Sequence, residues 1–544
     1  MRRTNSTPWS QRAASFALAG VLALSAGAVT AGLLPTPALA VDGSVTITQQ
    51  ANPDAKYDLY RIFTADIDGE NNATNIKLDA SVDKGALVTF LNDHDYQTWL
   101  AGKDAEAGQN LLEFISTQID GSAGLGENPE WVDDGTFADA FAEWVTANVG
   151  AATATVGKDE AFTGPEGYYL ILTNKDSLSG SDVATSPIWF PLGGKADSVM
   201  EKAKPVTITK EVQEDSEVAL PGEGWKDVAD AEIGQEVPYR ITVSTPANYN
   251  AYTTFKMEVT DTLPGGMTMS EDDVKVHLDS ATGTDVTSSF TISYDDETKA
   301  LTVSCADTKK IPGLGANGKV VVTYTAKLTS LDDAQIVYGG AGNENKAVYR
   351  FSNNPDSDTM GEISDTAKLY VYMVTVDKFD KVTQEALEGA QFVIQNAEGK
   401  FLKDGAWVGT SQDEATVFTT DEDGAIDGIK GLDAGTYTLI EIKAPDGYVT
   451  PTGDAAKTQI TVTATYSADG SIDEFTGEAT GLGTLDGEET NRTAGTVGID
   501  VANDKNISLA MTGAEGVGIG GAVVVAVGLG WYLVRRHRMS ADQA

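Results

Sequence analysis

The sequence predicts a mainly β protein made of tandem β-sandwich domains. Short segments rich in β-branched residues recur through residues 203–505, and turn clusters at 263–266 and 353–355 bound some of them. No helical pattern of catalytic-domain size occurs in this region. At about 150 residues per domain, the 544-residue chain accommodates three domains between its two terminal segments.

Residues 1–40 have the features of a secretory signal. Arg2, Arg3 and Arg12 precede an apolar stretch, and the small-x-small triplet at 38–40 is a cleavage site. We therefore expect the protein to be exported and this segment to be removed.

The composition excludes several classes of function. The formal charge is −43, so few cations are available to neutralise phosphates and we expect no nucleic-acid partner. Cys305 is the single cysteine, which excludes an intramolecular disulfide. The acidic segment 421–427 lacks the spaced glutamate of an EF-hand, and we predict no metal site and no cofactor.

The first domain, residues 41–202, is predicted to be a β domain with helical insertions. Strands are expected at 45–47, 57–63 and 167–172. Apolar residues at approximately helical spacing form two groups: Leu111, Leu112, Phe114, Ile115 and Ile119, and then Phe137, Phe141, Trp144 and Val145. We interpret the aromatic residues as core and not as a carbohydrate-binding platform.

The second domain, 203–368, and the third, 369–505, are both predicted to be sandwiches. In the second, strands are expected at 206–212, 237–243, 255–259, 290–294, 301–303, 319–328 and 347–351. In the third, strands are expected at 371–376, 391–394, 437–442, 458–463 and 497–501.

Each of these two domains places a lysine on the apolar face of its first strand. Residues two apart share a face of a strand, so Lys210 lies with Val206, Ile208 and Val212. Lys378 follows Tyr372, Val374 and Val376 in the same way. A single such lysine is explained by an edge position that reaches solvent, but the repetition disfavours this explanation.

The same alternation finds an acid in a middle strand and an asparagine in the last strand. Asp261 shares a face with residues 255, 257 and 259, and Glu441 shares one with 437 and 439. In the last strands, Asn345 and Asn353 share one apolar face, with Asn343 two residues upstream, and Asn503 lies on the corresponding face of the third domain.

Burial makes this combination reactive. Desolvation lowers a lysine pKa toward a neutral amine and raises a carboxyl pKa toward a protonated acid. Such an amine can attack the asparagine carbonyl, expel ammonia and leave an isopeptide crosslink, with the acid shuttling protons. The alternative interpretation of the same three residues is a buried salt bridge between the lysine and the acid, beside a hydrogen-bonded asparagine, with no crosslink.

The first domain departs from this pattern. Gln49 stands where a lysine is expected on the face of Val45 and Ile47, and the candidate last strand, 187–191, has no asparagine. We predict no crosslink there and a more labile domain.

Several motifs carry a family resemblance. Residues 437–448, Tyr-Thr-Leu-Ile-Glu-Ile-Lys-Ala-Pro-Asp-Gly-Tyr, resemble the E-box of Gram-positive pilins with collagen-adhesin B-type (Cna-B) domains. Segments 259–267, 342–347 and 351–355 are similar to the isopeptide-forming middle domain of fimbrial subunits. The resemblance covers essentially the whole mature chain and implies immunoglobulin-like (Cna-type) sandwiches.

The resemblance also implies the crosslinks. It pairs Lys210 with Asn345, assisted by Asp261, and Asn353 remains the alternative partner. In the third domain it pairs Lys378 with Asn503, assisted by Glu441.

The C-terminal segment 506–544 resembles the cell-wall sorting signal read by sortases. The motif Leu-Ala-Met-Thr-Gly at 509–513 precedes a charge-free run at 517–534 and a basic tail. That run is just long enough for a transmembrane helix, which needs roughly 20 residues. The family motif is Leu-Pro-x-Thr-Gly, so cleavage is expected between Thr512 and Gly513, although Ala510 replaces the proline. An ordinary tail anchor is the alternative.

Shaft pilins of this family also use a lysine at the junction of their first two domains, which resolves the sortase thioester of another subunit. Their motif ends in Tyr-Pro-Lys, which is absent here. Lys202 lies at the corresponding junction, downstream of Trp189, and Lys204 and Lys195 are alternatives. An ordinary linker lysine would explain the same residue.

The resemblance implies a structural subunit of a covalently polymerised fimbria that is secreted and anchored in the cell wall. Its implied partners are a sortase, further copies of the chain, peptidoglycan and a possible host receptor. The alternative is a tip or singly anchored adhesin that binds a host protein or glycan through its first domain. No HExxH or GxSxG motif occurs, so we expect no enzyme beyond autocatalytic crosslinking.

Overall fold

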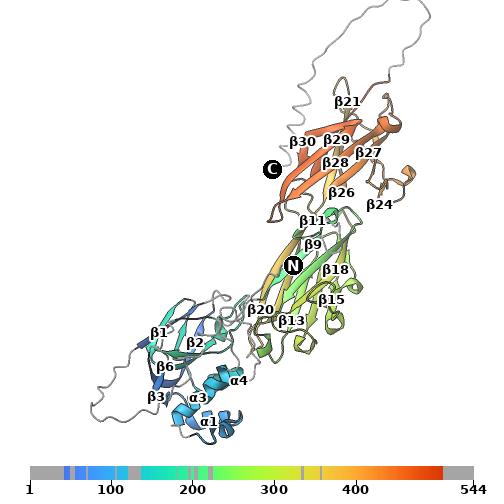
Figure 1. Cartoon of the computed structure of the whole chain (residues 1–544). Helices are drawn as coiled ribbons and strands as arrows, with labels where there is room; N and C mark the ends of the chain where they lie inside the picture. The colour runs from blue at the N-terminus through green and yellow to red at the C-terminus, as the bar shows by residue number, and fades with distance from the viewer. Residues whose placement is uncertain are drawn as a thin grey trace, which may run out of the picture.

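The computed structural model shows three mainly β domains that follow one another along the chain (Figure 1). It describes residues 42–48, 55–68, 72–103, 107–120, 137–157, 159–180, 182–193, 198–200, 206–217, 224–331, 336–355 and 358–506. The predicted fold class is confirmed over these residues: tandem sandwiches dominate, and the described α-helices lie in the first domain.

The first domain contains two sheets, with strand orders β5-β1-β8 and β3-β2-β6-β7, and β4 pairs with β2. Its strands are β1 (Asp42–Thr48), β2 (Tyr57–Ile67), β3 (Ala73–Leu78), β4 (Ala154–Val156), β5 (Ala161–Pro165), β6 (Gly167–Thr173), β7 (Ile188–Leu192) and β8 (Ser198–Met200). The short edge strand β8 runs parallel to β1.

Four helices pack beside the β2–β6 sheet: α1 (Lys84–Asn92), α2 (Tyr96–Leu100), α3 (Ala107–Asp120) and α4 (Phe137–Asn148). The predicted helical segments are α3 and α4, and their apolar residues, such as Phe114 and Phe141, are buried. The aromatic residues form a core, as expected. Helix α1 was not predicted because only Leu87 and Leu91 of its short sequence are buried; Asp83 caps its N-terminus.

The second domain is a sandwich of two sheets, ordered β10-β9-β12-β18-β14, with β15 beside β18, and β11-β20-β19-β13-β17-β16. Its strands are β9 (Ile208–Gln213), β10 (Trp225–Lys226), β11 (Val228–Asp230), β12 (Glu236–Ser244), β13 (Met257–Thr262), β14 (Met267–Met269), β15 (Lys275–Leu278), β16 (Thr291–Asp295), β17 (Ala300–Cys305), β18 (Lys319–Leu328), β19 (Asn343–Ser352) and β20 (Met360–Tyr370). Along β12 every second residue is buried, which is the pattern of a strand with one face on a core.

The third domain is a sandwich of sheets ordered β26-β21-β31-β30 and β25-β22-β27-β28-β29, with a separate β23–β24 pair. Its strands are β21 (Tyr372–Asp380), β22 (Gln391–Gln395), β23 (Leu402–Lys403), β24 (Ala406–Trp407), β25 (Phe418–Thr419), β26 (Ala425–Leu432), β27 (Gly435–Lys443), β28 (Lys457–Tyr466), β29 (Ile472–Gly481), β30 (Gly483–Asn491) and β31 (Thr496–Asn503). The first and last strands, β21 and β31, are parallel neighbours.

The second and third domains meet through a short, buried junction. Strand β20 ends at Tyr370 and β21 begins at Tyr372, so one residue separates the two sandwiches. The Ile233 amide donates to the Gly431 carbonyl at 3.0 Å, and the Tyr466 hydroxyl donates to Asp230 at 2.7 Å. These contacts fix one domain against the other.

Several predicted features lie outside the described residues: the signal 1–40, Gln49, the linkage lysines Lys195, Lys202 and Lys204, the cleavage pair Thr512 and Gly513, and the span 517–534. Among the residues that are described, no helix has the length and apolarity that a membrane crossing requires.

Candidate crosslinking sites

Lys210 lies in the centre of the second domain's core. It occupies an inward position of β9, its side chain has no exposed surface, and its register partner on β12 is Ile241. The ammonium lies 4.8 Å from the ring centroid of Tyr239 and 5.3 Å from that of Tyr324. Desolvation lowers the pKa of Lys210, and the neighbouring Asp261 opposes that shift.

Asp261 and Tyr324 surround the lysine amine. Lys210 Nζ lies 2.8 Å from Asp261 Oδ1 and donates to the Tyr324 hydroxyl at 3.0 Å. That hydroxyl in turn donates to the other carboxylate oxygen of Asp261. Lys210 and Tyr324 come from the β9–β18 sheet, whereas Asp261 comes from β13 in the opposite sheet.

Asn345 completes this group from β19, the strand next to Asp261. Its side-chain nitrogen donates to the Tyr324 hydroxyl at 2.8 Å, and the residue has no exposed surface. Asn345 Oδ1 accepts no hydrogen bond from the described residues. A bond between Lys210 and Asn345 would therefore join the two sheets across the core.

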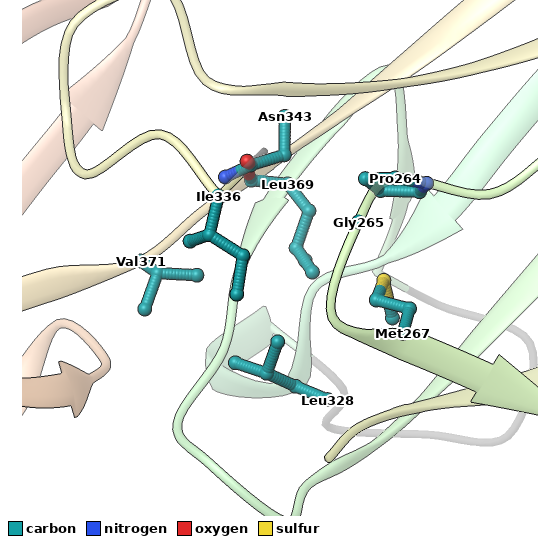
Figure 2. A pocket seen from close by; sticks show the side chains of 8 residues that line it. All are labelled: Pro264, Gly265, Met267, Leu328, Ile336, Asn343, Leu369 and Val371. Carbon is teal, nitrogen blue, oxygen red and sulfur yellow. The ribbon is translucent and has the colours of Figure 1, made fainter. Parts of the chain in front are cut away.

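The other two asparagines of this strand region are engaged elsewhere. Asn353 accepts from the Thr359 hydroxyl at 2.8 Å, and its backbone carbonyl accepts from the Ala184 amide at the first domain. Asn343 holds the backbone of Val337 through two hydrogen bonds of 2.8 Å. Asn343 borders a small apolar hollow that Figure 2 shows. The other residues that line it are Pro264, Gly265, Met267, Leu328, Ile336, Leu369 and Val371.

The third domain repeats the combination with a different geometry. Lys378, Glu441 and Asn503 are at most 3% exposed. Lys378 Nζ donates to the Val501 carbonyl at 3.2 Å, and the Asn503 side-chain nitrogen donates directly to Glu441 Oε1 at 2.6 Å. Lys378 and Asn503 lie on the parallel neighbours β21 and β31, and Glu441 reaches them from β27 in the other sheet.

Burial shifts both titrating groups of the third domain toward neutral forms. Desolvation lowers the pKa of Lys378 to about 8, although Glu441 opposes the shift. Desolvation also raises the pKa of Glu441, against the opposing effects of Lys378 and the Asn503 hydrogen bond. A neutral amine and a protonated acid are the forms that attack on an amide requires.

Tyr324 was not predicted from the sequence as a site residue. The available signal was strand alternation: Tyr324 shares the buried face of β18 with Val320, Val322 and Ala326. A phenol on such a face needs a hydrogen-bonding partner. Nothing in the sequence, however, specified that the partners would be the triad of the opposite sheet.

One group of side chains in the described part of the chain brings carboxylates together as a metal ion would require. Oxygens of Asp377, Asp486 and Asp500 lie within 4.8 Å of one another on the β21–β31–β30 sheet. Burial, with Asp377 nearby, raises the pKa of Asp500 to about 6. Asp486 is buried and the other two are half-buried, but acids cluster readily in a chain of charge −43, and we assign no ion to them.

Residues 372–473 match a family model described as the prealbumin-like fold domain of SpaA. The matched segment covers most of the third domain, which is therefore similar to this prealbumin-like fold. The E-box that carried the resemblance lies inside the matched segment. No curated protein matches the chain.

Solved structures resemble most of the chain. The T6 backbone pilin of Streptococcus pyogenes is 15% identical, covers 86% of this chain and 100% of its own, and has a TM-score of 0.50. Two major pilins of Corynebacterium diphtheriae also match. SpaD is 16% identical, covers 86% of this chain and 98% of its own, and has a TM-score of 0.44. SpaA is 14% identical, covers 85% of this chain and 100% of its own, and has a TM-score of 0.43. At this identity the T6 match shows a shared fold, and the resemblance to pilins stated above is confirmed at that level.

Proposed function

We propose that the protein is the shaft subunit of a covalently polymerised, cell-wall-anchored fimbria, stabilised by the crosslinks Lys210–Asn345 and Lys378–Asn503. The observation that carries this proposal is the repetition of a buried lysine, acid and asparagine in two successive sandwiches. A structural subunit needs no substrate pocket, and the related fold belongs to a backbone pilin. The chemistry is then confined to the chain's own side chains.

The crosslinks account for stability in a protein with one cysteine. Each would close nearly a whole domain, since it joins the first strand to a strand near the domain's end. By analogy with disulfides, closing a loop of about 100 residues stabilises the folded state by about 4.7 kcal/mol. Unlike a disulfide, an amide bond resists reduction.

The polymerisation itself would use the two segments outside the described residues. A sortase would cleave between Thr512 and Gly513, and the amine of Lys202 on the next subunit would take over the Thr512 acyl group. Load entering at Lys202 and leaving at Thr512 would then pass through the crosslinked domains. The final subunit would be transferred to peptidoglycan by the same chemistry.

A ladder assay tests this assignment. Purified protein that retains the sorting motif is incubated with a recombinant pilus-assembling sortase, and multimers are resolved by denaturing electrophoresis. We expect a ladder from the wild type, none from Thr512→Ala, and none from Lys202→Ala, with Lys175→Ala as the control. That variant removes an exposed first-domain lysine and should still form the ladder. A ladder from Lys202→Ala would refute the linkage residue. Failure of the wild type to form multimers would favour a singly anchored adhesin.

A further inference from the structure

Tyr324 contacts every member of the second domain's triad. Its hydroxyl accepts from Lys210 at 3.0 Å and from the Asn345 nitrogen at 2.8 Å, and it donates to Asp261. The Tyr239 ring stacks on it at 5.3 Å with an interplanar angle of 16° and so fixes its orientation. No other hydroxyl on the described part of this domain bridges all three groups.

In the third domain the acid contacts the asparagine directly, without an intervening phenol. There Glu441 bonds directly to the Asn503 amide at 2.6 Å. In the second domain Asp261 bonds to Lys210 and Tyr324, and its path to the Asn345 nitrogen runs through the phenol. An aspartate is one methylene shorter than a glutamate, so an intervening hydroxyl restores the reach of the acid.

We propose that Tyr324 is a catalytic residue of crosslink formation in the second domain, relaying a proton from Asp261 to the departing nitrogen of Asn345. The inference rests on the crosslink of the proposed function and assigns the proton path within it.

The steps balance without another reactant. Lys210 Nζ first passes a proton to Asp261, which leaves a neutral amine and a carboxylic acid. The amine lone pair forms a bond to Asn345 Cγ, and the carbonyl π electrons move to Oδ1. As the carbonyl re-forms, the Cγ–Nδ2 bond breaks with its electron pair on nitrogen. Tyr324 gives that nitrogen its proton and takes one from Asp261, and the attacking nitrogen returns a proton to the carboxylate. The products are one amide and one ammonia.

The phenol is suited to a relay because it remains protonated. Complete burial raises the pKa of Tyr324 well above its ordinary value, and the nearby Asp261 adds to the shift. A neutral hydroxyl both donates and accepts, so it passes a proton on without holding a charge in the core.

The test measures ammonia loss in the full chain with Lys378→Ala, where only the second domain can react. Protein from cell-free synthesis is sampled over time, and intact mass gives the fraction that has lost one ammonia. We expect Tyr324→Phe to slow this loss by about 100-fold or more, the scale of general acid–base catalysis. Tyr349→Phe is the matched control. It removes another fully buried phenol of the same domain, whose hydroxyl donates to the Ser244 carbonyl at 3.2 Å, and should leave the rate unchanged.

The possible outcomes separate the two claims. If the Lys378→Ala parent loses no ammonia, the crosslink is refuted and the relay with it. If the parent reacts and Tyr324→Phe reacts at the same rate, the relay alone is refuted. Near-ultraviolet circular dichroism against Lys210→Ala, which cannot crosslink, shows whether Tyr324→Phe has folded. If it has not, 3-fluorotyrosine at position 324 keeps the ring and makes the phenol a stronger acid. Faster ammonia loss then supports the relay, and an unchanged rate overturns it.

Discussion

Lys210 and Asp261 form an ion pair of 2.8 Å although neither side chain has exposed surface. Such a pair loses most of its hydration, and the attraction between the charges offsets that loss only while both partners remain. In the unreacted chain this ion pair precedes the reaction. A proton transfer from Lys210 to Asp261 removes both charges and produces the amine that attacks Asn345.

Asp261→Asn should therefore abolish the second-domain crosslink and destabilise that domain. The variant leaves Lys210 buried without its counter-charge, which typically costs about 3–5 kcal/mol relative to the unreacted pair, and it also lacks the crosslink. The measurements are intact mass, expected to show one ammonia loss from the variant's own formula mass where the wild type shows two, and the unfolding midpoint in guanidinium. Glu258→Gln, on the half-exposed neighbouring face of β13, should change neither. Retention of both ammonia losses in Asp261→Asn would contradict the role of the acid.

The position of the asparagines predicts which one reacts. Asn345→Ala should prevent one ammonia loss, because no other side-chain amide hydrogen-bonds to Tyr324 or Lys210 among the described side chains. Asn353→Ala should keep both losses, since its side chain bonds to Thr359 near the first domain. Intact mass decides between them, and the opposite result would assign the crosslink to Asn353.

The shifted pKa of Lys378 predicts an alkaline rise in stability when the third domain cannot crosslink. In Asn503→Ala the lysine stays unreacted, with a pKa of about 8 when folded and an ordinary value of 10.5 when unfolded. Between these values the unfolded chain binds more protons, so the free energy of unfolding should increase from pH 8 to pH 10.5, by at most about 3 kcal/mol. Glu441, whose pKa burial raises, gives the opposite slope above its ordinary value.

Denaturant titration at several pH values measures this slope. Adding Lys378→Met to Asn503→Ala should remove the alkaline rise, because the titrating amine is gone while the stem remains apolar. A rise that persists without Lys378 would show that another group causes it.

The junction between the second and third domains should weaken as pH increases through the acid range. Burial raises the pKa of Asp230 to about 6, and raises that of Asp433, which it contacts across the junction. Because the folded state binds protons more tightly here, the junction is most stable below the ordinary value of 3.8 and loses stability as pH rises to about 6.

Hydrogen exchange of the Ala434 amide reports on this contact, because the amide donates to Asp433 at 2.7 Å and to Asp230 at 3.3 Å. After correction for the intrinsic pH dependence, its protection should fall between pH 4 and pH 7 in the wild type. In the Asp230→Asn, Asp433→Asn double variant, where neither junction acid can ionise, protection should be nearly constant. Equal pH profiles for both proteins would contradict the prediction.

Strand alternation was enough to place the lysines, acids and asparagines on buried faces, because a strand with one covered face has a strict period of two. It could not predict β29 and β30, whose acidic residues are mostly exposed and which are held by pairing with β28 and β31. Strand β20 was not predicted either, because its burial pattern is irregular and lacks a period of two.

The contacts between the two sheets of the sandwich also could not be predicted from the sequence. Alternation assigns Tyr324 to a face but does not determine which residue of the opposite sheet it meets. That depends on the register between β13 and β19, where Asp261 pairs with Ala347, and on how the two sheets pack. The geometry of the third domain, with its acid bonded directly to the amide, differs for the same reason.

The intact mass of the mature exported protein tests the central claim most directly. We predict that the wild type weighs two ammonias less than its sequence formula, Lys378→Ala one ammonia less, and the Lys210→Ala, Lys378→Ala double variant the full formula mass. Full formula mass in the folded wild type would contradict the account.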